Sequence, residues 1–217
     1  MNPLRFLSVV PILALLSCHT ADKPFELLSG DLLFSVSSGN SELLGAIQNS
    51  TSEKEEIPFS HVGIVSVEED DIYVIEATAP EGVIRSTLDD FFGEAASLEG
   101  KKLIAVGRLH RKWRNTIPEA LEAAVTCLGK EYDYLYDESN DAYYCSELVR
   151  KVFIDSAGNP LFEPLPMSFK NMKTGNTDPF WEEHFGKLHS SVPEGEPGTN
   201  PADMARSGII QIVHTYY

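Results

Sequence analysis

The residue best suited to covalent chemistry is Cys145, which lies where a tyrosine-rich segment, residues 131–144, gives way to an amphipathic stretch. Apolar residues at helical spacing, followed by Gly158, predict a helix from about residue 145 to 157. Free N–H groups and the positive dipole end at a helix N-terminus stabilise a thiolate and can hold an oxyanion. Cys145 is therefore a candidate nucleophile, and the alternative is a buried cysteine that packs as a small apolar side chain.

A candidate base for that thiol is His61, which lies in a segment of alternating residue types. In a strand, alternation puts His61 on the same face as Phe59, Gly63 and Val65. Gly63 has no side chain, so we expect room beside the histidine for another group to approach. There His61 would take the thiol proton and later protonate the leaving group, whereas the alternative is a histidine satisfied inside the core.

The third candidate is Glu76, in the next predicted strand along the chain. If the acidic turn pairs Glu68 with Asp71, Glu76 stands diagonal to His61 on the same face of the hairpin. A carboxylate there would orient the imidazole and stabilise its charged form. A slip of one residue would turn Glu76 to the other face, so its alternative role is that of a solvated carboxylate.

The surrounding elements must bring these three residues together. Alternating or apolar runs bounded by turn residues predict strands at residues 31–36, 59–67, 72–78, 83–86, 103–109 and 209–214. Helical spacing predicts helices at residues 43–47, 88–92, 116–128, 145–157 and 180–185, the third framed by a capping box of Thr116 and Glu119. The strands form a meander without strand–helix–strand alternation, which predicts an α+β fold with a small antiparallel sheet packed against helices.

Five short motifs follow one another in an order that resembles a known family. They are Gly30-Asp31-Leu32-Leu33-Phe34, Ser60-His61-Val62-Gly63-Ile64, Val74-Ile75-Glu76-Ala77, Tyr132-Asp133 and Tyr144-Cys145-Ser146-Glu147-Leu148. The set is similar to the circularly permuted, NlpC-like branch of papain-fold cysteine hydrolases, the YiiX-like family, in which the histidine strand precedes the cysteine helix. The resemblance spans residues 28–153, and residues 197–201 are similar to the tails of exported members.

The resemblance implies a role for each candidate. Cys145 would be the nucleophile, His61 the general base and Glu76 the residue that orients the histidine. The thiolate would attack an amide or ester carbonyl and form an acyl-enzyme. Asp31 and the tyrosines Tyr132 and Tyr144 are further candidates for the lining of the cleft.

The composition of the chain disfavours several other classes of function. The 217 residues include 17 basic and 33 acidic ones, and the net charge of −16 disfavours binding to nucleic acid. With 42% hydrophobic residues the chain can bury a core, and its length suits a single domain. No Cys-x-x-Cys, His-x-x-x-His or glycine-rich phosphate loop occurs, so neither a metal site nor a cofactor is expected.

The N-terminus has the features of a targeting segment. Residues 1–17 carry one positive charge and a short apolar run, and the sequence Leu15-Leu16-Ser17-Cys18 resembles the cleavage site of bacterial lipoproteins. This pattern predicts a signal peptide at 1–17, a lipidated Cys18, a linker at 18–26 and a domain at 27–217 with a loop-rich extension at 159–217. The chain would then be exported and lipid-anchored in the bacterial cell envelope; the alternative is secretory cleavage nearby, with Cys18 a free thiol.

Taken together, these features predict a cysteine amidase or peptidase whose substrate is a small peptide or amide, such as a peptidoglycan-derived peptide. Two alternatives remain open at this point. One is a lipid acyltransferase or phospholipase of the same fold. The other is a non-catalytic lipoprotein in which Cys127 and Cys145 form a disulfide, which an exported location would permit.

Overall fold

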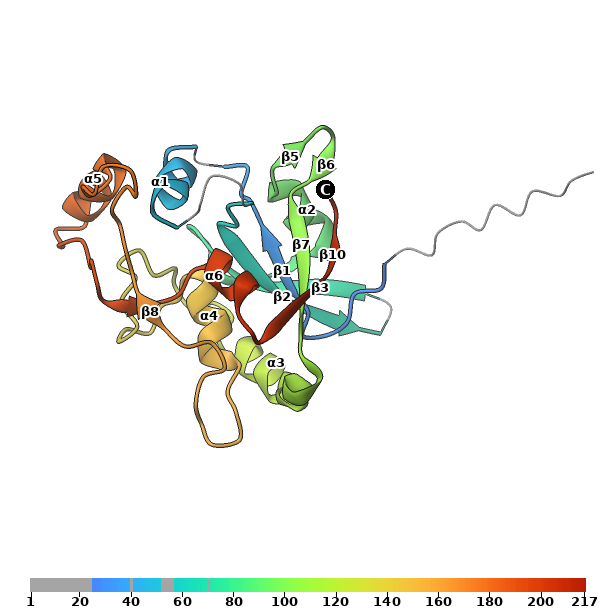
Figure 1. Ribbon diagram of the computed structural model, residues 1–217. Helices are drawn as coiled ribbons and strands as arrows, with labels where there is room; N and C mark the ends of the chain where they lie inside the picture. Colours follow the sequence, from blue (N-terminus) through green and yellow to red (C-terminus); the bar gives the residue numbers. More distant parts are fainter. Residues whose placement is uncertain (1–24, 40, 52–56, 70) are drawn as a thin grey trace, which may run out of the picture.

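A computed structural model describes residues 25–39, 41–51, 57–69 and 71–217 of the chain (Figure 1). The predicted signal peptide, Cys18 and most of the predicted linker lie outside these residues. Within the described part of the chain, no helix has the length and apolar character needed to cross a membrane.

The centre of the fold is a six-stranded sheet in the order β10-β7-β1-β2-β3-β4. Its strands are β1 (Leu32–Ser35), β2 (His61–Glu68), β3 (Asp71–Thr78), β4 (Gly82–Thr87), β7 (Ile104–Leu109) and β10 (Ile210–Thr215). All neighbouring strands in the sheet pair antiparallel. The α+β class and the antiparallel sheet predicted from the sequence are therefore confirmed.

The hairpin of β2 and β3 has the register that the acidic turn predicts. Glu68 pairs with Asp71, and Gly63 stands opposite Glu76. Glu69, inside the turn, has a left-handed backbone with φ of 55°, as tight hairpin turns require. The register places Glu76 diagonal to His61 on one face of the hairpin.

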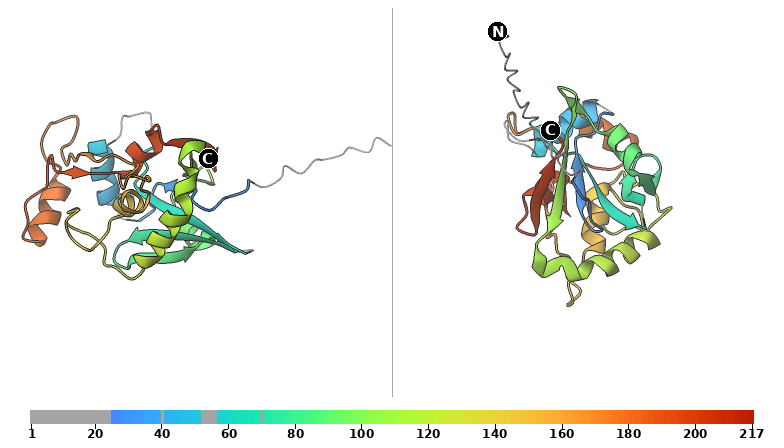
Figure 2. Two further views of the ribbon diagram at one scale, coloured as in Figure 1. Left: turned by 90° about the horizontal axis from the view of Figure 1, so that it is seen from below. Right: turned by 90° about the vertical axis from the view of Figure 1, so that its right-hand side faces the viewer.

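Apolar side chains cover both faces of the sheet, because successive residues of each strand point to opposite sides. On one face, helices α3 (Ile117–Thr126) and α4 (Cys145–Val152) pack on a core that includes Phe34 and Ile64 (Figure 2). On the other face, α2 (Leu88–Glu94) brings Phe91 against Val65. The cysteine helix therefore packs on the central strands and reaches the end of the sheet at which β2 begins.

The C-terminal extension builds a third apolar cluster beside the sheet. Helix α5 (Pro179–Lys187) contacts α1 (Ser41–Thr51), and the cluster between them includes Phe169, Trp181 and Phe185. The other short elements are β5 (Ser97–Leu98), β6 (Lys101–Lys102), the 3₁₀ helix η1 (Arg111–Thr116), β8 (Leu165–Pro166), β9 (Pro197–Gly198) and α6 (Pro201–Arg206). The sequence did not predict α6, although Asn200 caps it by accepting the Asp203 N–H at 2.8 Å.

One predicted capping arrangement and one predicted helix end are wrong. The predicted capping box at Thr116 does not form, because η1 runs directly into α3 and the Thr116 hydroxyl donates to the Trp113 carbonyl at 2.7 Å. Helix α4 ends at Val152 rather than near residue 157. Downstream, the Asp155 carboxylate accepts the backbone N–H of Ala157 at 2.8 Å, a side-chain bond that competes with helix continuation.

Candidate active site

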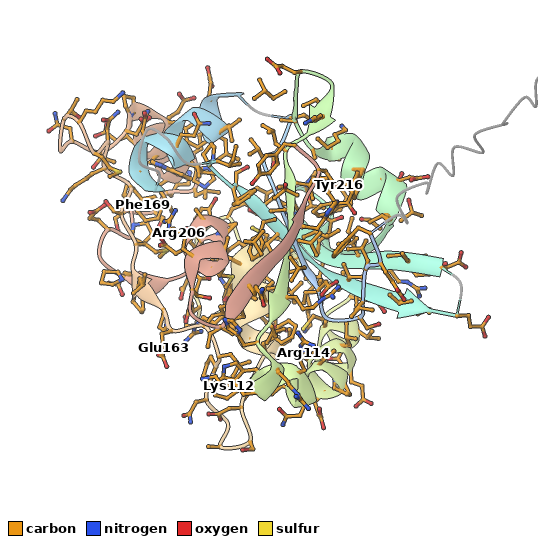
Figure 3. The ribbon with its side chains drawn as sticks, turned by 45° about the vertical axis from the view of Figure 1, so that its right-hand side comes forward. Lys112, Arg114, Glu163, Phe169, Arg206 and Tyr216 are labelled. Atoms are coloured by element: carbon orange, nitrogen blue, oxygen red, sulfur yellow. The ribbon has the colours of Figure 1, made fainter. Side chains whose placement is uncertain are left out.

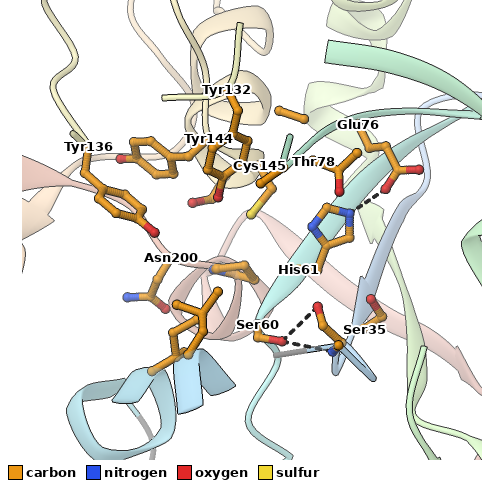
Figure 4. A pocket seen from close by; sticks show the side chains of 18 of the residues that line it. Ser35, Ser60, His61, Glu76, Thr78, Tyr132, Tyr136, Tyr144, Cys145 and Asn200 are labelled. Carbon is orange, nitrogen blue, oxygen red and sulfur yellow. Dashed lines mark hydrogen bonds and ion pairs between the residues drawn. The ribbon is translucent and has the colours of Figure 1, made fainter. Parts of the chain in front are cut away.

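The three candidate residues meet at one end of the sheet (Figure 4). His61 is the first residue of β2, Glu76 lies in β3, and Cys145 is the first residue of α4. The His61 Nε2 lies 2.5 Å from the Glu76 Oε2, so its other ring nitrogen, Nδ1, is left for the hydrogen bond to Cys145. Figure 4 shows the Cys145 sulfur on the side of the imidazole away from Glu76. The structure thus brings together the three residues singled out in the sequence.

The backbone at the start of α4 leaves N–H groups open around the thiol. Tyr144, the N-cap, has an extended backbone, and the Leu148 N–H closes the first turn by donating to the Tyr144 carbonyl at 3.0 Å. The buried Glu147 carboxylate accepts the Tyr144 N–H at 3.3 Å. The N–H groups of a first helical turn have no intrahelical partners, so they can bind an anion next to Cys145.

The electrostatics of the site favour a charged imidazole. Burial alone would lower the pKa of His61, but its hydrogen bonds to Cys145 and Glu76 outweigh burial and raise this pKa to about 10. For Glu76, burial opposes the charge, yet the hydrogen bonds from His61 and Ser86 hold its pKa below the usual value of 4.5. The arrangement therefore stabilises an imidazolium between a carboxylate and the sulfur.

Ser86, in β4, is a member of this network that sequence reasoning missed. Its hydroxyl donates to the Glu76 Oε1 at 2.5 Å, while the other carboxylate oxygen holds His61. The available signal was a polar residue at an inward position of a predicted strand. Because the strands are paired, Ser86 stands diagonal to Glu76.

We expect Ser86→Ala to lower kcat/KM about 5- to 10-fold, since a net hydrogen bond contributes on the order of 1 kcal/mol. Without this hydrogen bond the pKa of Glu76 rises, so the acid limb of the pH–rate profile should move to higher pH. The control is Ser66→Ala, because Ser66 lies in β2 but donates to Glu68 outside the site. Equal profiles for both variants would contradict the role of Ser86.

A cavity of about 870 Å³ opens over the three residues. Its wall on the side of the C-terminal extension is mostly aromatic, formed by Tyr132, Tyr134, Tyr136, Phe169, Phe180 and Trp181. Near His61 the lining is more polar and includes Ser37 and Ser60, whose hydroxyl accepts the Ser37 N–H at 3.0 Å. A group bound here would thus meet an apolar surface on one side of Cys145 and a polar one on the other.

The predicted cleft tyrosines Tyr132 and Tyr144 both line the cavity, as does Tyr136, which sequence reasoning missed. The hydroxyls of Tyr132 and Tyr136 hydrogen-bond to each other. Burial raises the pKa of both, and the charge of a Cys145 thiolate adds to it. Both therefore stay protonated at neutral pH, as hydrogen-bond donors must.

Asp31, also predicted for the cleft, lies elsewhere. It is 1% exposed, and its carboxylate binds Arg108 through two hydrogen bonds of 2.7 Å, Nε to Oδ1 and Nη2 to Oδ2. It precedes β1, whose other end, Ser35, is the one paired with His61. The basic residues beyond Arg108, including Lys112 and Arg114, are exposed at the surface (Figure 3). Asp31 therefore links the start of β1 to Arg108 in β7, at the end of the sheet away from Cys145.

We expect Asp31→Ala to lower the free energy of unfolding by about 3 kcal/mol, because a partly buried Arg108 loses its partner. Urea denaturation would measure this change. Alkylation of Cys145 in the folded protein should keep its wild-type pH dependence, since Asp31 does not line the cavity. A shifted pH dependence of alkylation with unchanged stability would contradict this structural role and support a role for Asp31 in the cleft.

Two further expectations need correction. The room expected beside His61 at Gly63 is occupied by the protein itself, because a Cβ there would lie 2.3 Å from Val74 Cγ1 and 3.1 Å from Phe91 Cε2. Cys127 and Cys145 are both free thiols, which contradicts the alternative built on a disulfide between them.

Comparisons with known proteins relate the chain to one family and one fold. Residues 26–214 match the family described as permuted papain-like amidase enzyme, YaeF/YiiX, C92 family. The chain is 26% identical to the Escherichia coli K12 protein YiiX over 175 residues, which is 80% of this chain and 79% of that protein. A crystal structure of YiiX from Escherichia coli O157:H7 superposes with a TM-score of 0.70 at 25% identity and covers 87% of this chain and 97% of that chain.

The Escherichia coli O157:H7 protein in that crystal structure is described as a metalloprotein. Among the residues described for the present chain, no group of three or more His, Cys, Asp and Glu side chains is arranged to hold a metal ion.

Proposed function

The chain belongs to the permuted papain-like amidase family of YaeF and YiiX, and on that basis we propose that it is a cysteine amidase whose catalytic residues are Cys145, His61 and Glu76. One observation carries the proposal. A single imidazole is hydrogen-bonded to Glu76 on one side and to Cys145 on the other, at the edge of a cavity large enough for a substrate. The open N–H groups of the first turn of α4 add a place for the oxyanion.

In this mechanism the Cys145 thiolate attacks the carbonyl carbon of an amide, and the carbonyl π electrons move to the oxygen. The first-turn N–H groups and the hydroxyl of Tyr132 or Tyr136 stabilise that oxyanion. When the intermediate collapses, the carbon–nitrogen bond breaks and the His61 imidazolium protonates the departing amine. The product is a thioester on Cys145, with His61 now neutral.

Hydrolysis of the thioester completes the cycle. Neutral His61 takes a proton from water, and the resulting hydroxide attacks the thioester carbon. The second intermediate collapses with loss of the Cys145 thiolate, and a carboxylic acid leaves. Glu76, fixed by Ser86, holds the His61 ring in place through both proton transfers.

The two sides of the cavity support a proposal for the class of substrate. The leaving amine must lie beside His61, where the lining is polar, and the acyl group then lies toward the aromatic wall. This favours a substrate in which the acyl side of the amide is apolar. A cell-wall peptide or another small peptide with hydrophobic residues on that side would fit. The same wall supports a second candidate function, in which a lipid supplies the acyl group and an amine or water accepts it.

Trapping of the acyl-enzyme tests the proposal and separates the two candidates. The protein is mixed with acylated peptide amides or with phospholipid vesicles, quenched in acid, and weighed intact. The proposal predicts a mass increase equal to the acyl group minus one hydrogen, located at Cys145 and absent in Cys145→Ala. An adduct formed from vesicles alone would favour the lipid reaction, and no adduct from either source would contradict both.

We also propose that the chain is exported and anchored through a lipidated Cys18; the support is the sequence pattern Leu15-Leu16-Ser17-Cys18. Mass spectrometry of the N-terminal peptide from protein made in a bacterium would test this. A diacylated peptide that begins at Cys18 is expected, and an unmodified cysteine within a longer peptide would contradict it.

A further inference from the structure

The C-terminal extension touches the chain on both sides of the nucleophile. The Thr199 N–H donates to the Tyr144 hydroxyl at 3.1 Å, and the Ser146 hydroxyl donates to the Thr199 carbonyl at 3.0 Å. Tyr144 and Ser146 are the residues immediately before and after Cys145. One residue, more than fifty positions away in sequence, therefore holds both neighbours of the reactive thiol.

The segment that carries Thr199 is itself fixed in place. Gly198 pairs with Leu165 in the β8–β9 ribbon, and Asn200 caps α6. A Cβ at Gly198 would lie 2.4 Å from Met167 Sδ and 3.1 Å from the Tyr144 hydroxyl, so a larger residue would have to displace the Met167 side chain and would crowd that hydroxyl. We call residues 198–200 the tail clamp.

The two side chains that the clamp holds are buried, while Thr199 itself is partly buried. Ser146 is 1% exposed and Tyr144 is 2% exposed. A buried hydroxyl that loses its partner is costly, so these bonds hold their geometry more firmly than surface contacts would. They hold the residues on either side of Cys145, and with them the backbone that carries the first N–H groups of α4.

We propose that the tail clamp is a positioning device for the nucleophile, with Tyr144 and Ser146 as positioning residues that keep the Cys145 sulfur aligned with His61. The inference rests on the proposed cysteine chemistry and goes beyond it. The same extension carries Phe169 and Trp181 of the aromatic wall, so one segment of the chain supplies both the clamp and part of the acyl-binding surface. A displacement of the order of 1 Å at a reacting atom can change a rate by about 100-fold.

The test removes each hydrogen bond with the smallest change, by Tyr144→Phe, Ser146→Ala and the double variant. The readouts are the pH midpoint of iodoacetamide alkylation at Cys145, kcat and KM on the peptide amide that gives the acyl-enzyme, and stability in urea. Each single variant should raise the alkylation midpoint by about 0.5 to 1 pH unit and lower kcat about 5- to 10-fold, with KM little changed. The fold-loss in kcat of the double variant should be smaller than the product of the two single fold-losses, because both residues act through Thr199.

Matched controls are Tyr73→Phe and Thr126→Ala, which remove a tyrosine hydroxyl and a hydroxyl-to-carbonyl bond away from the cavity lining. Variants with reduced stability but the wild-type alkylation midpoint and kcat would overturn the positioning role. If the double variant does not fold, the two single variants decide by the same criteria. A wild-type protein whose Cys145 alkylates like a free thiol would overturn the proposed function itself, and the role of the clamp with it.

Discussion

Replacing Cys145 with alanine is expected to lower turnover of an amide substrate by about 10⁴-fold or more, because none of the other described residues that line the cavity is a cysteine that could form the thioester. Binding should survive, since the aromatic wall and the start of α4 are unchanged by loss of one sulfur atom. The measurement is kcat and KM for hydrolysis, together with substrate affinity of the variant by calorimetry. Retained affinity with lost turnover would assign Cys145 to the chemical step rather than to binding.

The second free cysteine provides the matched control. Cys127 is buried like Cys145, but it is the C-cap residue of α3 and does not line the cavity. Cys127→Ala should therefore cost some stability and leave kcat near the wild-type value. Loss of turnover in Cys127→Ala with activity retained in Cys145→Ala would contradict the assignment.

His61→Ala is expected to have the next largest effect, a fall in kcat of about 10³- to 10⁴-fold. Without the imidazole the leaving amine has no proton donor and water has no base. His110→Ala is the control, because His110 is exposed and does not line the cavity. Equal activity of the two histidine variants would remove His61 from the mechanism.

His61 and Glu76 together set the expected pH dependence of the wild-type protein. The pKa of His61 is raised from 6.5 to about 10, so the stabilisation that it contributes is complete below 6.5 and is lost as the pH rises through about 10. The pKa of Glu76 is lowered, so its contribution is present above 4.5 and is lost as the pH falls below that value. Activity should accordingly decline on the alkaline side near pH 10, where the imidazolium loses its proton.

Local sequence rules were enough for the core of the site. The acidic turn at residues 68–71 fixed the register of one hairpin, and the register put Glu76 beside His61. The change from a tyrosine-rich segment to helical spacing placed Cys145 at a helix start. Each inference needed only a few neighbouring residues, which is why it could be drawn without a structure.

Contacts between distant segments could not be predicted in this way. Asp31 lies beside Arg108 because β1 pairs with β7, and the local sequence around neither residue indicates that pairing. Ser86 joins the site only through the pairing of β3 with β4. The role of Thr199 depends on the path of the whole extension, whose loops follow packing rather than periodic patterns.

The space around the glycines shows the same limit. Gly63 was expected to leave room beside His61 for another group to approach, and Val74 and Phe91 of the protein itself occupy that room. At Gly198 a close approach does occur, between the tail and the Tyr144 hydroxyl. Sequence alone identifies a residue without a side chain, and only the fold determines what approaches it.

The most direct test of the central claim is the pH dependence of iodoacetamide alkylation at Cys145, measured by peptide mass spectrometry in the wild type and in His61→Ala. A thiolate–imidazolium pair predicts fast labelling well below the free-thiol pKa of about 8.5 and a strong slowing in the variant. Slow labelling that is indifferent to His61 would mean an inert, buried cysteine and would contradict the proposed catalysis.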